Sequence, residues 1–492
     1  MRFLKGAARV APVLLIFGLA SCQDFLDVNE SPNTPETATV DIRLPALETA
    51  FIHSTYYGDA ALWSGEWTQQ FSFNAESRSY SQVQRYELSE TDASGTWDYF
   101  YSRPGNASFT MIRDASEPGD IYYRGLGRLF YAWTFQMITD LWGPAPYTES
   151  FKPEIREPKY DDQKTIYAGV IASLDTAVTE LSSATGRLPN VNDLLFEGDM
   201  SRWVKLARYL QARTYLRVGY APGEDKVARA NQALDALAGA FTSNADDADF
   251  TYPGGDDARN PNWMFQDQQN TFVAANYIVE LLKSRNDPRL PVMFTPIVYD
   301  SARGTNRYLA TTERYVGHAN GTSPLADSTV SWVGPFFSAE DAPLNLASYS
   351  DQKFTEAEAR LIVTGPAAAD APYREGIRAS MEKLGVSSGD IDTYLAARPD
   401  LGTMAADTAL KAIITEKYIT NFLKVEPWND WRRTGYPNFP SPVPQAMLPN
   451  VPQRVRTPGS ELSNNINSVT ATGIPLGLDG MNTKVWWAGG SQ

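Results

Sequence analysis

Two consecutive stretches in which apolar residues recur every three or four positions constrain the fold of this chain most strongly. The first stretch contains Ile166, Val170, Leu174, Ala177, Val178 and Leu181, and the second contains Trp203, Leu206, Ala207 and Leu210. This spacing places each set on one face of a helix. A loop rich in Asn, Gly and Pro, residues 185–199, separates them. The pattern therefore predicts a helical hairpin.

Further helical patterns cover residues 41–51, 225–241, 353–364, 372–386 and 405–424. Paired helices of this length favour packing of the tetratricopeptide type, although no exact 34-residue repeat is present. Residues 243–352 are rich in Asn, Asp, Gly, Pro and aromatics, which predicts long loops with short helices or strands, and 427–492 is expected to be irregular. The fold class is therefore mainly α, with helical hairpins and large irregular loop regions. The length accommodates one large domain or two ordinary ones.

The single cysteine, Cys22, closes a pattern typical of a bacterial lipoprotein signal. Arg2, Lys5 and Arg9 precede an apolar run at 10–20, and small residues lead into Cys22. The run is too short to span a bilayer, which takes about 20 apolar residues. We expect residues 1–21 to be removed as a signal peptide, Cys22 to carry the lipid, and the polar residues 22–40 to act as a tether. With that thiol lipidated, no disulfide can form, so stability must come from burial.

The net charge of the chain and the absence of common catalytic motifs limit which ligands and reactions are expected. The chain carries a formal charge of −15, which becomes −18 when the three basic residues of the signal are removed, so nucleic acid is a poor partner. His53 and His318 do not lie in a metal-binding spacing, and no phosphate-binding loop or GxSxG motif appears. The aspartates between 246 and 257 lack the EF-hand pattern and are expected to form a solvated acidic loop. We predict no catalytic residue, no metal ligand and no cofactor. A glycosidase carboxylate pair, which leaves little sequence trace, stays an alternative.

Aromatic residues mixed with amides and Arg indicate a ligand site. A sugar has an apolar C–H face that a ring can cover, and hydroxyls that amides and guanidinium groups can bind; a peptide suits the same groups. Three such clusters lie in stretches that read as loops: 56–101, 262–272 and 315–337. We expect them to converge on one site whose ligand-binding residues are Trp63, Trp67, Phe71, Asn74, Arg78, Tyr80, Trp263, Tyr315 and Trp332.

Five phrases along the chain carry a family resemblance. They are DFLDVNESPN at 24–33, DLWGPAPYTE at 140–149, NDPRL at 286–290, YREGIRASME at 373–382 and EPWNDWRRTGYP at 426–437. In this order they resemble the SusD/RagB-like nutrient-binding outer-membrane lipoproteins of Bacteroidota, particularly the branch with the DFLDVN opening. Thr355 and Glu356 stand where the family usually has apolar residues, and Gln453 and Thr457 interrupt its PRRxxYP phrase.

The resemblance implies a single α-helical domain over 41–492, with four tetratricopeptide-like hairpins and a loop-rich half that carries the ligand site. It also implies an outer-membrane, lipid-anchored protein facing the cell exterior. Such a protein is not an enzyme: it captures an oligosaccharide and acts as a lid that delivers it to a TonB-dependent barrel of the SusC type. A peptide is the nearest alternative ligand; a surface glycan hydrolase and a purely structural lipoprotein are the competing classes. Trp428, Trp431, Arg432 and Arg433 are expected to be structural, with the guanidinium groups paired with carboxylates.

Overall fold

The computed structural model describes residues 39–76, 81–255, 258–297, 314–326 and 329–491, without the side chains of Tyr56, Tyr57 and Gln268. The predicted signal peptide, Cys22 and nearly all of the predicted tether lie outside these residues. The first helix, α1, begins at Val40, next to the predicted start of the folded domain.

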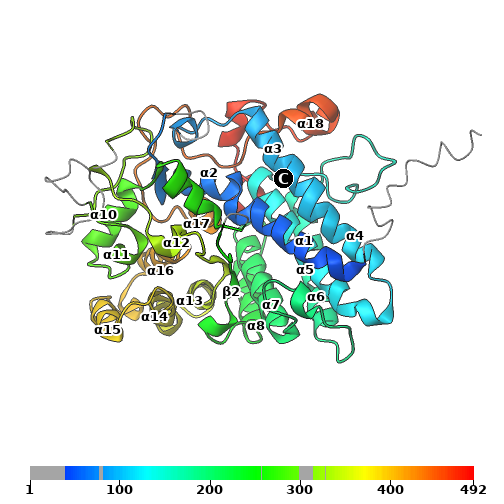
Figure 1. Ribbon diagram of the computed structural model, residues 1–492, viewed down its shortest axis with the longest axis horizontal. Coiled ribbons are helices and arrows are strands. Elements are labelled where there is room, and N and C mark those ends of the chain that lie inside the picture. The colour runs from blue at the N-terminus through cyan, green and yellow to red at the C-terminus, as the bar shows by residue number, and fades with distance from the viewer. Residues whose placement is uncertain (1–38, 77–80, 256–257, 298–313, 327–328, 492) are drawn as a thin grey trace, which may run out of the picture.

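Eight helices form four hairpins of consecutive, contacting helices, most of which lie in the lower part of the view (Figure 1). The pairs are α5 (Ile121–Trp142) with α6 (Gln163–Leu181), α7 (Met200–Val218) with α8 (Lys226–Leu237), α13 (Tyr349–Val363) with α14 (Pro366–Lys383), and α16 (Ala406–Thr420) with α17 (Glu426–Thr434). Successive pairs pack together, since α6 contacts α7, α8 contacts α13 and α13 contacts α16. This arrangement confirms the mainly α fold with helical hairpins. The hairpin predicted from residues 166–181 and 203–210 corresponds to α6 and α7, which contact each other but belong to neighbouring pairs.

Aspartates begin three of these helices. The side chain of Asp162 accepts a hydrogen bond from the backbone N–H of Thr165, and Asp225 accepts one from Ala228. Asp199 caps α7 in the same way. Such caps satisfy backbone donors that the first helical turn leaves unpaired, so they help to set where each helix starts.

The rest of the molecule is built from shorter elements and long loops. Its helices are α1 (Val40–Ile52), α2 (Asp59–Trp67), α3 (Glu90–Phe100), α4 (Asn106–Asp114), α9 (Pro261–Trp263), α10 (Asn276–Ser284), α11 (Leu290–Met293), α12 (Pro335–Ser338), α18 (Gly459–Asn464) and α19 (Ile466–Ala471), while α15 (Ser388–Ala396) packs against α14. The strands form two antiparallel pairs: β1 (Phe71–Phe73) with β3 (Phe272–Ala274), and β2 (Ala248–Phe250) with β4 (Leu344–Ala347). The short elements predicted between 243 and 352 are therefore present.

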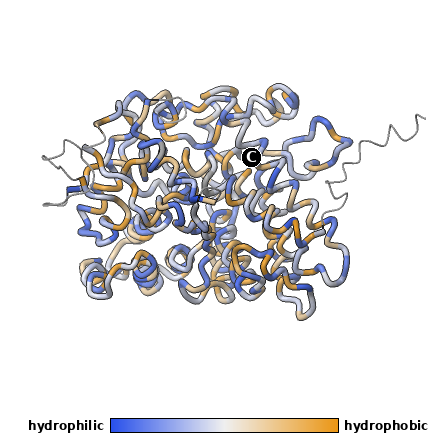
Figure 2. The backbone as a smooth tube through the Cα atoms, in the orientation of Figure 1, coloured by the Kyte–Doolittle hydropathy of each residue, from blue (hydrophilic) through white to orange (hydrophobic). Residues whose placement is uncertain are grey.

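Several helices were not predicted, and the reason is burial. In α5, 18 of 22 residues are buried, so the helix lacks the polar face that produces a helical period. The same holds for α2, which lies in the stretch read as a loop. α17 has a different reason. It falls almost entirely within the segment expected to be irregular, an expectation that its proline favoured. Pro427 occupies the first turn of the helix, where a proline is tolerated. Figure 2 shows apolar and polar residues interleaved along most of the chain, in keeping with one domain that buries a face of nearly every helix.

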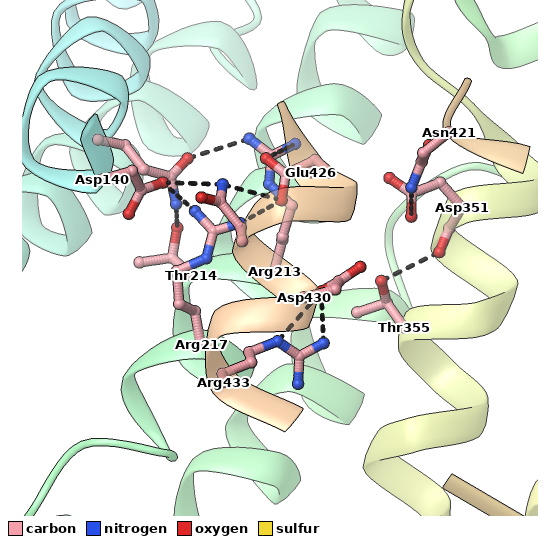
Figure 3. A network of polar contacts seen from close by, with 12 residues as sticks. Asp140, Arg213, Thr214, Arg217, Asp351, Thr355, Asn421, Glu426, Asp430 and Arg433 are labelled. Atoms are coloured by element: carbon pink, nitrogen blue, oxygen red, sulfur yellow. Dashed lines mark hydrogen bonds and ion pairs between the residues drawn. The ribbon is translucent and has the colours of Figure 1, made fainter. Parts of the chain in front are cut away.

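Buried charges hold α17 among α5, α7, α13 and α16 (Figure 3). Arg217 of α7 donates hydrogen bonds to Asp140 of α5 and to Glu426 of α17. Arg433 of α17 donates to Glu358 of α13 and, at 2.6 Å, to Asp430. Burial by itself would raise the pKa of Glu358, but the charge and hydrogen bonds of Arg433 outweigh it and lower that pKa to about 2.

The residues of the EPWNDWRRTGYP phrase have the expected structural character. Trp428 is fully buried and Trp431 is partly buried. Arg433 is paired with carboxylates as predicted, whereas Arg432 instead donates to Asn429 and, at 2.9 Å, to the carbonyl of Gln453. Among the described helices, none has the length and apolar character needed to cross a membrane.

Candidate functional site

Three of the predicted ligand-binding rings lie in the core. Trp67 and Phe71 are fully buried and Trp63 is 3% exposed. The indole N–H of Trp67 donates to the carbonyl of Val83 at 3.0 Å, and the rings of Trp67 and Trp428 pack edge to face with centroids 5.0 Å apart. These rings have no exposed face on which a sugar could stack, which contradicts their predicted role. They are buried because α2 and β1 are regular elements of the core and not loops.

Asn74 is also occupied by the protein itself. Its amide nitrogen donates to the carbonyl of Leu325 at 2.8 Å, and its amide oxygen accepts from the N–H of the same residue at 2.7 Å. The side chain therefore fastens two loops together. Arg78 and Tyr80 lie outside the described residues, and their role stays a prediction.

The three aromatic clusters do meet, but in a packed region. β1 pairs with β3, and Val273 of β3 forms a bridge to Trp332. Trp332 and Tyr315 are each 7% exposed and belong to apolar clusters. Trp263, in α9, is half-buried, with the guanidinium carbon of Arg259 4.3 Å from its ring centroid. Of the predicted rings within the described residues, Trp263 alone keeps a substantial exposed surface.

An open cleft of about 740 Å³ lies where α1, α3 and α4 meet the loop after β2. Its rings are His53, Tyr99, Phe250 and Tyr252, and its polar residues include Arg43, Thr49, Ser102, Arg103, Asn106 and Thr110. We call it the tyrosine cleft. His53 and Tyr99 also line an adjoining space of about 260 Å³, which reaches Asp59 and Phe265. Trp263 lies in sequence between Pro261, which lines the cleft, and Phe265, which lines this extension.

Three π-helical turns come together around the tyrosine cleft and its extension. They are His53–Tyr57, Tyr101–Gly105 and Met264–Gln268. Each contributes lining residues: His53 from the first, Ser102 and Arg103 from the second, and Phe265 from the third. Single π-helical turns interrupt the regular hydrogen-bond pattern and occur frequently at functional sites. Their convergence marks this cleft more clearly than the aromatic composition did.

The cleft offers both ring faces and polar groups. Burial raises the pKa of the Tyr99 phenol, although the charge of Arg103 opposes this, so Tyr99 is protonated at neutral pH and can donate as well as accept. Burial lowers the pKa of His53, which keeps the imidazole neutral. Arg43 is paired with Asp114, whereas Arg103 and the amide of Asn106 have no hydrogen-bond partner within the described structure. These two side chains can bind a ligand without breaking a protein hydrogen bond.

A second open cleft, of about 680 Å³, lies on the other side of α4. Phe109, Tyr101 and Phe151 contribute rings to it, and Ser102, Asn106 and Thr110 line it as well as the tyrosine cleft. We call it the phenylalanine cleft. A third cavity, between α12 and α14, measures about 60 Å³, which leaves room for a few water molecules but not for a sugar.

Three of the aspartates expected to form a solvated acidic loop, Asp246, Asp247 and Asp249, are instead paired with lysines, while Asp256 and Asp257 lie outside the described residues. Asp246 lies 2.7 Å from Lys205, and Asp247 lies 2.6 Å from Lys383. Both aspartates are buried, so the expectation of solvation is wrong for them. No group of three potential metal-binding side chains occurs within the parts of the chain that the structure describes.

Comparison with known proteins assigns the family. A family model described as "Starch-binding associating with outer membrane" matches residues 41–458, most of the chain. The chain belongs to the SusD-like family. No match is found among curated proteins. The family resemblance seen in the sequence is thereby confirmed, and the family description places these proteins at the outer membrane.

Solved structures similar to this SusD-like protein share its fold along nearly the whole chain. A chitin-binding protein is 24% identical, with a TM-score of 0.77, covering 92% of this chain and all of its own. A SusD/RagB family protein from Bacteroides thetaiotaomicron is 23% identical, with a TM-score of 0.78 and coverage of 93% and 100%. A chitin-binding SusD homolog from Flavobacterium johnsoniae is 21% identical, with a TM-score of 0.76 and coverage of 91% and 98%.

Proposed function

We propose that this SusD-like protein is a surface lipoprotein that captures an oligosaccharide in the tyrosine cleft and delivers it to a TonB-dependent transporter of the SusC type. The observation that carries the proposal is the lining of the cleft. Tyr99 and Tyr252 supply ring faces, while Arg103 and Asn106 supply donors at its rim. A sugar needs this combination, because its C–H face packs on a ring while its hydroxyls require hydrogen bonds.

The names of relatives support a glycan in preference to a peptide. The family description refers to starch, and two of the similar structures are described as chitin-binding. Two or three stacked rings and several hydrogen bonds give micromolar to millimolar affinity after the ordering of ligand and side chains is subtracted. Such affinity suits a protein that must release its ligand to a transporter.

Binding without hydrolysis fits the distribution of acidic side chains. A glycosidase needs two carboxyl groups that flank the scissile bond. Among the described residues that line the tyrosine cleft and its extension, Asp59 is the only acidic one, and it accepts a hydrogen bond from Thr96 at 3.0 Å. Within the tyrosine cleft and its extension, a single engaged carboxylate does not supply the acid and the base or nucleophile that the reaction requires.

Affinity electrophoresis against a panel of polysaccharides, followed by calorimetry with the matching oligosaccharides, tests the proposal. Wild-type protein is expected to be retarded by at least one polysaccharide, and Tyr99→Ala and Tyr252→Ala are expected to bind about tenfold more weakly. Tyr436→Ala is the matched control, because Tyr436 is another half-buried tyrosine and contacts Asp407 away from the cleft.

Three results would count against this function. If no polysaccharide retards the protein, a glycan is excluded as the ligand. If Tyr99→Ala and Tyr252→Ala bind with the same affinity as wild type, the tyrosine cleft is excluded as the binding site. Reducing ends released in proportion to protein concentration would show hydrolysis.

A further inference from the structure

We infer that the phenylalanine cleft is a second set of sugar subsites, and that the ligand is an extended oligosaccharide crossing α4 from one cleft to the other. This inference rests on the proposed function and specifies the length of its ligand. It concerns a surface that neither the family description nor the names of similar structures assign.

The two clefts share a polar ridge. Ser102, Asn106 and Thr110 are spaced four residues apart, so they lie along one face of the turn and helix that separate the clefts. All three line both clefts. The amide of Asn106 is exposed and has no hydrogen-bond partner in the described part of the chain. A ligand that crossed here would therefore meet hydroxyl and amide groups, which suit sugar hydroxyls.

The phenylalanine cleft has a ring pair of its own. Phe109 of α4 stacks on Phe151, with ring centroids 5.2 Å apart and planes inclined by 26°. Both side chains are only partly buried. Such a pair gives an apolar surface on which the C–H face of a sugar can lie, as Tyr99 and Tyr252 do in the first cleft.

The position of Phe151 is specified by several independent features. Its backbone has a φ of +58°, a conformation that residues other than glycine rarely adopt. Its ring lies over Gly105, where an added Cβ would be 2.9 Å from the ring. The preceding backbone is fixed by the carboxylate of Asp161, which accepts a hydrogen bond from the N–H of Thr148 at 2.6 Å. Unusual backbone conformations that the surroundings hold in place cluster at ligand-binding sites.

Calorimetry with malto-, chito- and xylo-oligosaccharides, each from the disaccharide to the heptasaccharide, tests the inference. In wild type, affinity is expected to rise roughly three- to tenfold when the oligomer becomes long enough to pass the ridge. Phe151→Asn should abolish this rise and leave the affinity for short oligomers unchanged, because Asn tolerates a positive φ but offers no ring. Phe109→Ala should do the same, and it guards against a folding defect in the first variant. Tyr99→Ala should weaken binding at every length.

The possible failures are distinct. If wild type binds but its affinity does not rise with length, or if the rise persists in both phenylalanine variants, the second set of subsites is refuted while the proposed function stands. If none of the three series binds at any length, the extended ligand is refuted, and the polysaccharide panel decides whether the proposed function fails with it.

Discussion

The substitution Glu358→Gln tests the buried charges that hold α17 against α13. Glu358 is completely buried and accepts hydrogen bonds from Arg433, at 2.7 Å to one of its nitrogens, and from the hydroxyl of Tyr220 at 2.5 Å. Gln resembles the protonated carboxyl and leaves Arg433 without this negative partner. Removing one member of a buried ion pair typically costs about 3–5 kcal/mol.

The pKa gives a second route to the magnitude. The pKa of Glu358 falls from 4.5 to about 2 on folding. Such a depression of the pKa corresponds to stabilisation of about 3 kcal/mol at neutral pH. Because the folded pKa is depressed, this contribution is complete above about pH 4.5 and is lost as the pH falls towards 2. We therefore expect Glu358→Gln to cost about 3 kcal/mol at pH 7, and the difference from wild type to shrink on acidification.

Urea unfolding followed by tryptophan fluorescence at several pH values measures this difference. The matched control is Glu356→Gln on the same helix: Glu356 pairs with Lys353 and Arg360 near the surface, each at 2.8 Å, and its loss should cost less than about 1 kcal/mol. Equal losses in the two variants, or a Glu358→Gln effect that does not diminish in acid, would refute this account of the buried pair.

Two further changes test the packing and the anchor. Gly65→Ala should destabilise the protein by about 1–3 kcal/mol, because the added Cβ would lie 2.2 Å from the ring of buried Phe71. The control is Gly389→Ala in α15, where the added Cβ would have no neighbouring atom within 4 Å. An unchanged midpoint of thermal unfolding in Gly65→Ala would contradict this packing. Cys22→Ala should release the protein from membranes and abolish oligosaccharide uptake, while oligosaccharide binding in solution persists. The control, Ser21→Ala, keeps a small residue before the cysteine and should stay anchored. A Cys22→Ala protein that still fractionates with membranes would exclude the proposed lipid anchor.

Individual hairpin helices such as α6 and α7 could be predicted from the sequence because each keeps one polar face. α6 and α7 alternate buried and exposed positions with helical spacing, and aspartates mark where both begin. The same reasoning could not find α5, whose sides are nearly all buried, since a helix without a polar face has no hydrophobic period. Pairings such as β1 with β3 join segments about 200 residues apart, and short apolar runs do not specify their partners.

The sequence contains a signal that locates one wall of the tyrosine cleft. Ala93, Thr96, Trp97 and Phe100 are the buried residues of α3, and their spacing is helical. Recognising that helix would have placed Tyr99 on the opposite, accessible face. The aromatic stretch as a whole has a poor helical period, so it predicts a loop and its largest rings become the expected ligand contacts. Large rings are attractive for stacking and equally attractive for a core, and only the burial of α2 separates the two roles.

A crystal structure of the protein in complex with the oligosaccharide that binds most tightly tests the central claim most directly. We predict a sugar ring stacked on Tyr99 or Tyr252, with hydrogen bonds from Arg103 or Asn106 to its hydroxyls. A sugar bound only elsewhere, for example against Trp332, with the tyrosine cleft empty, would contradict the account.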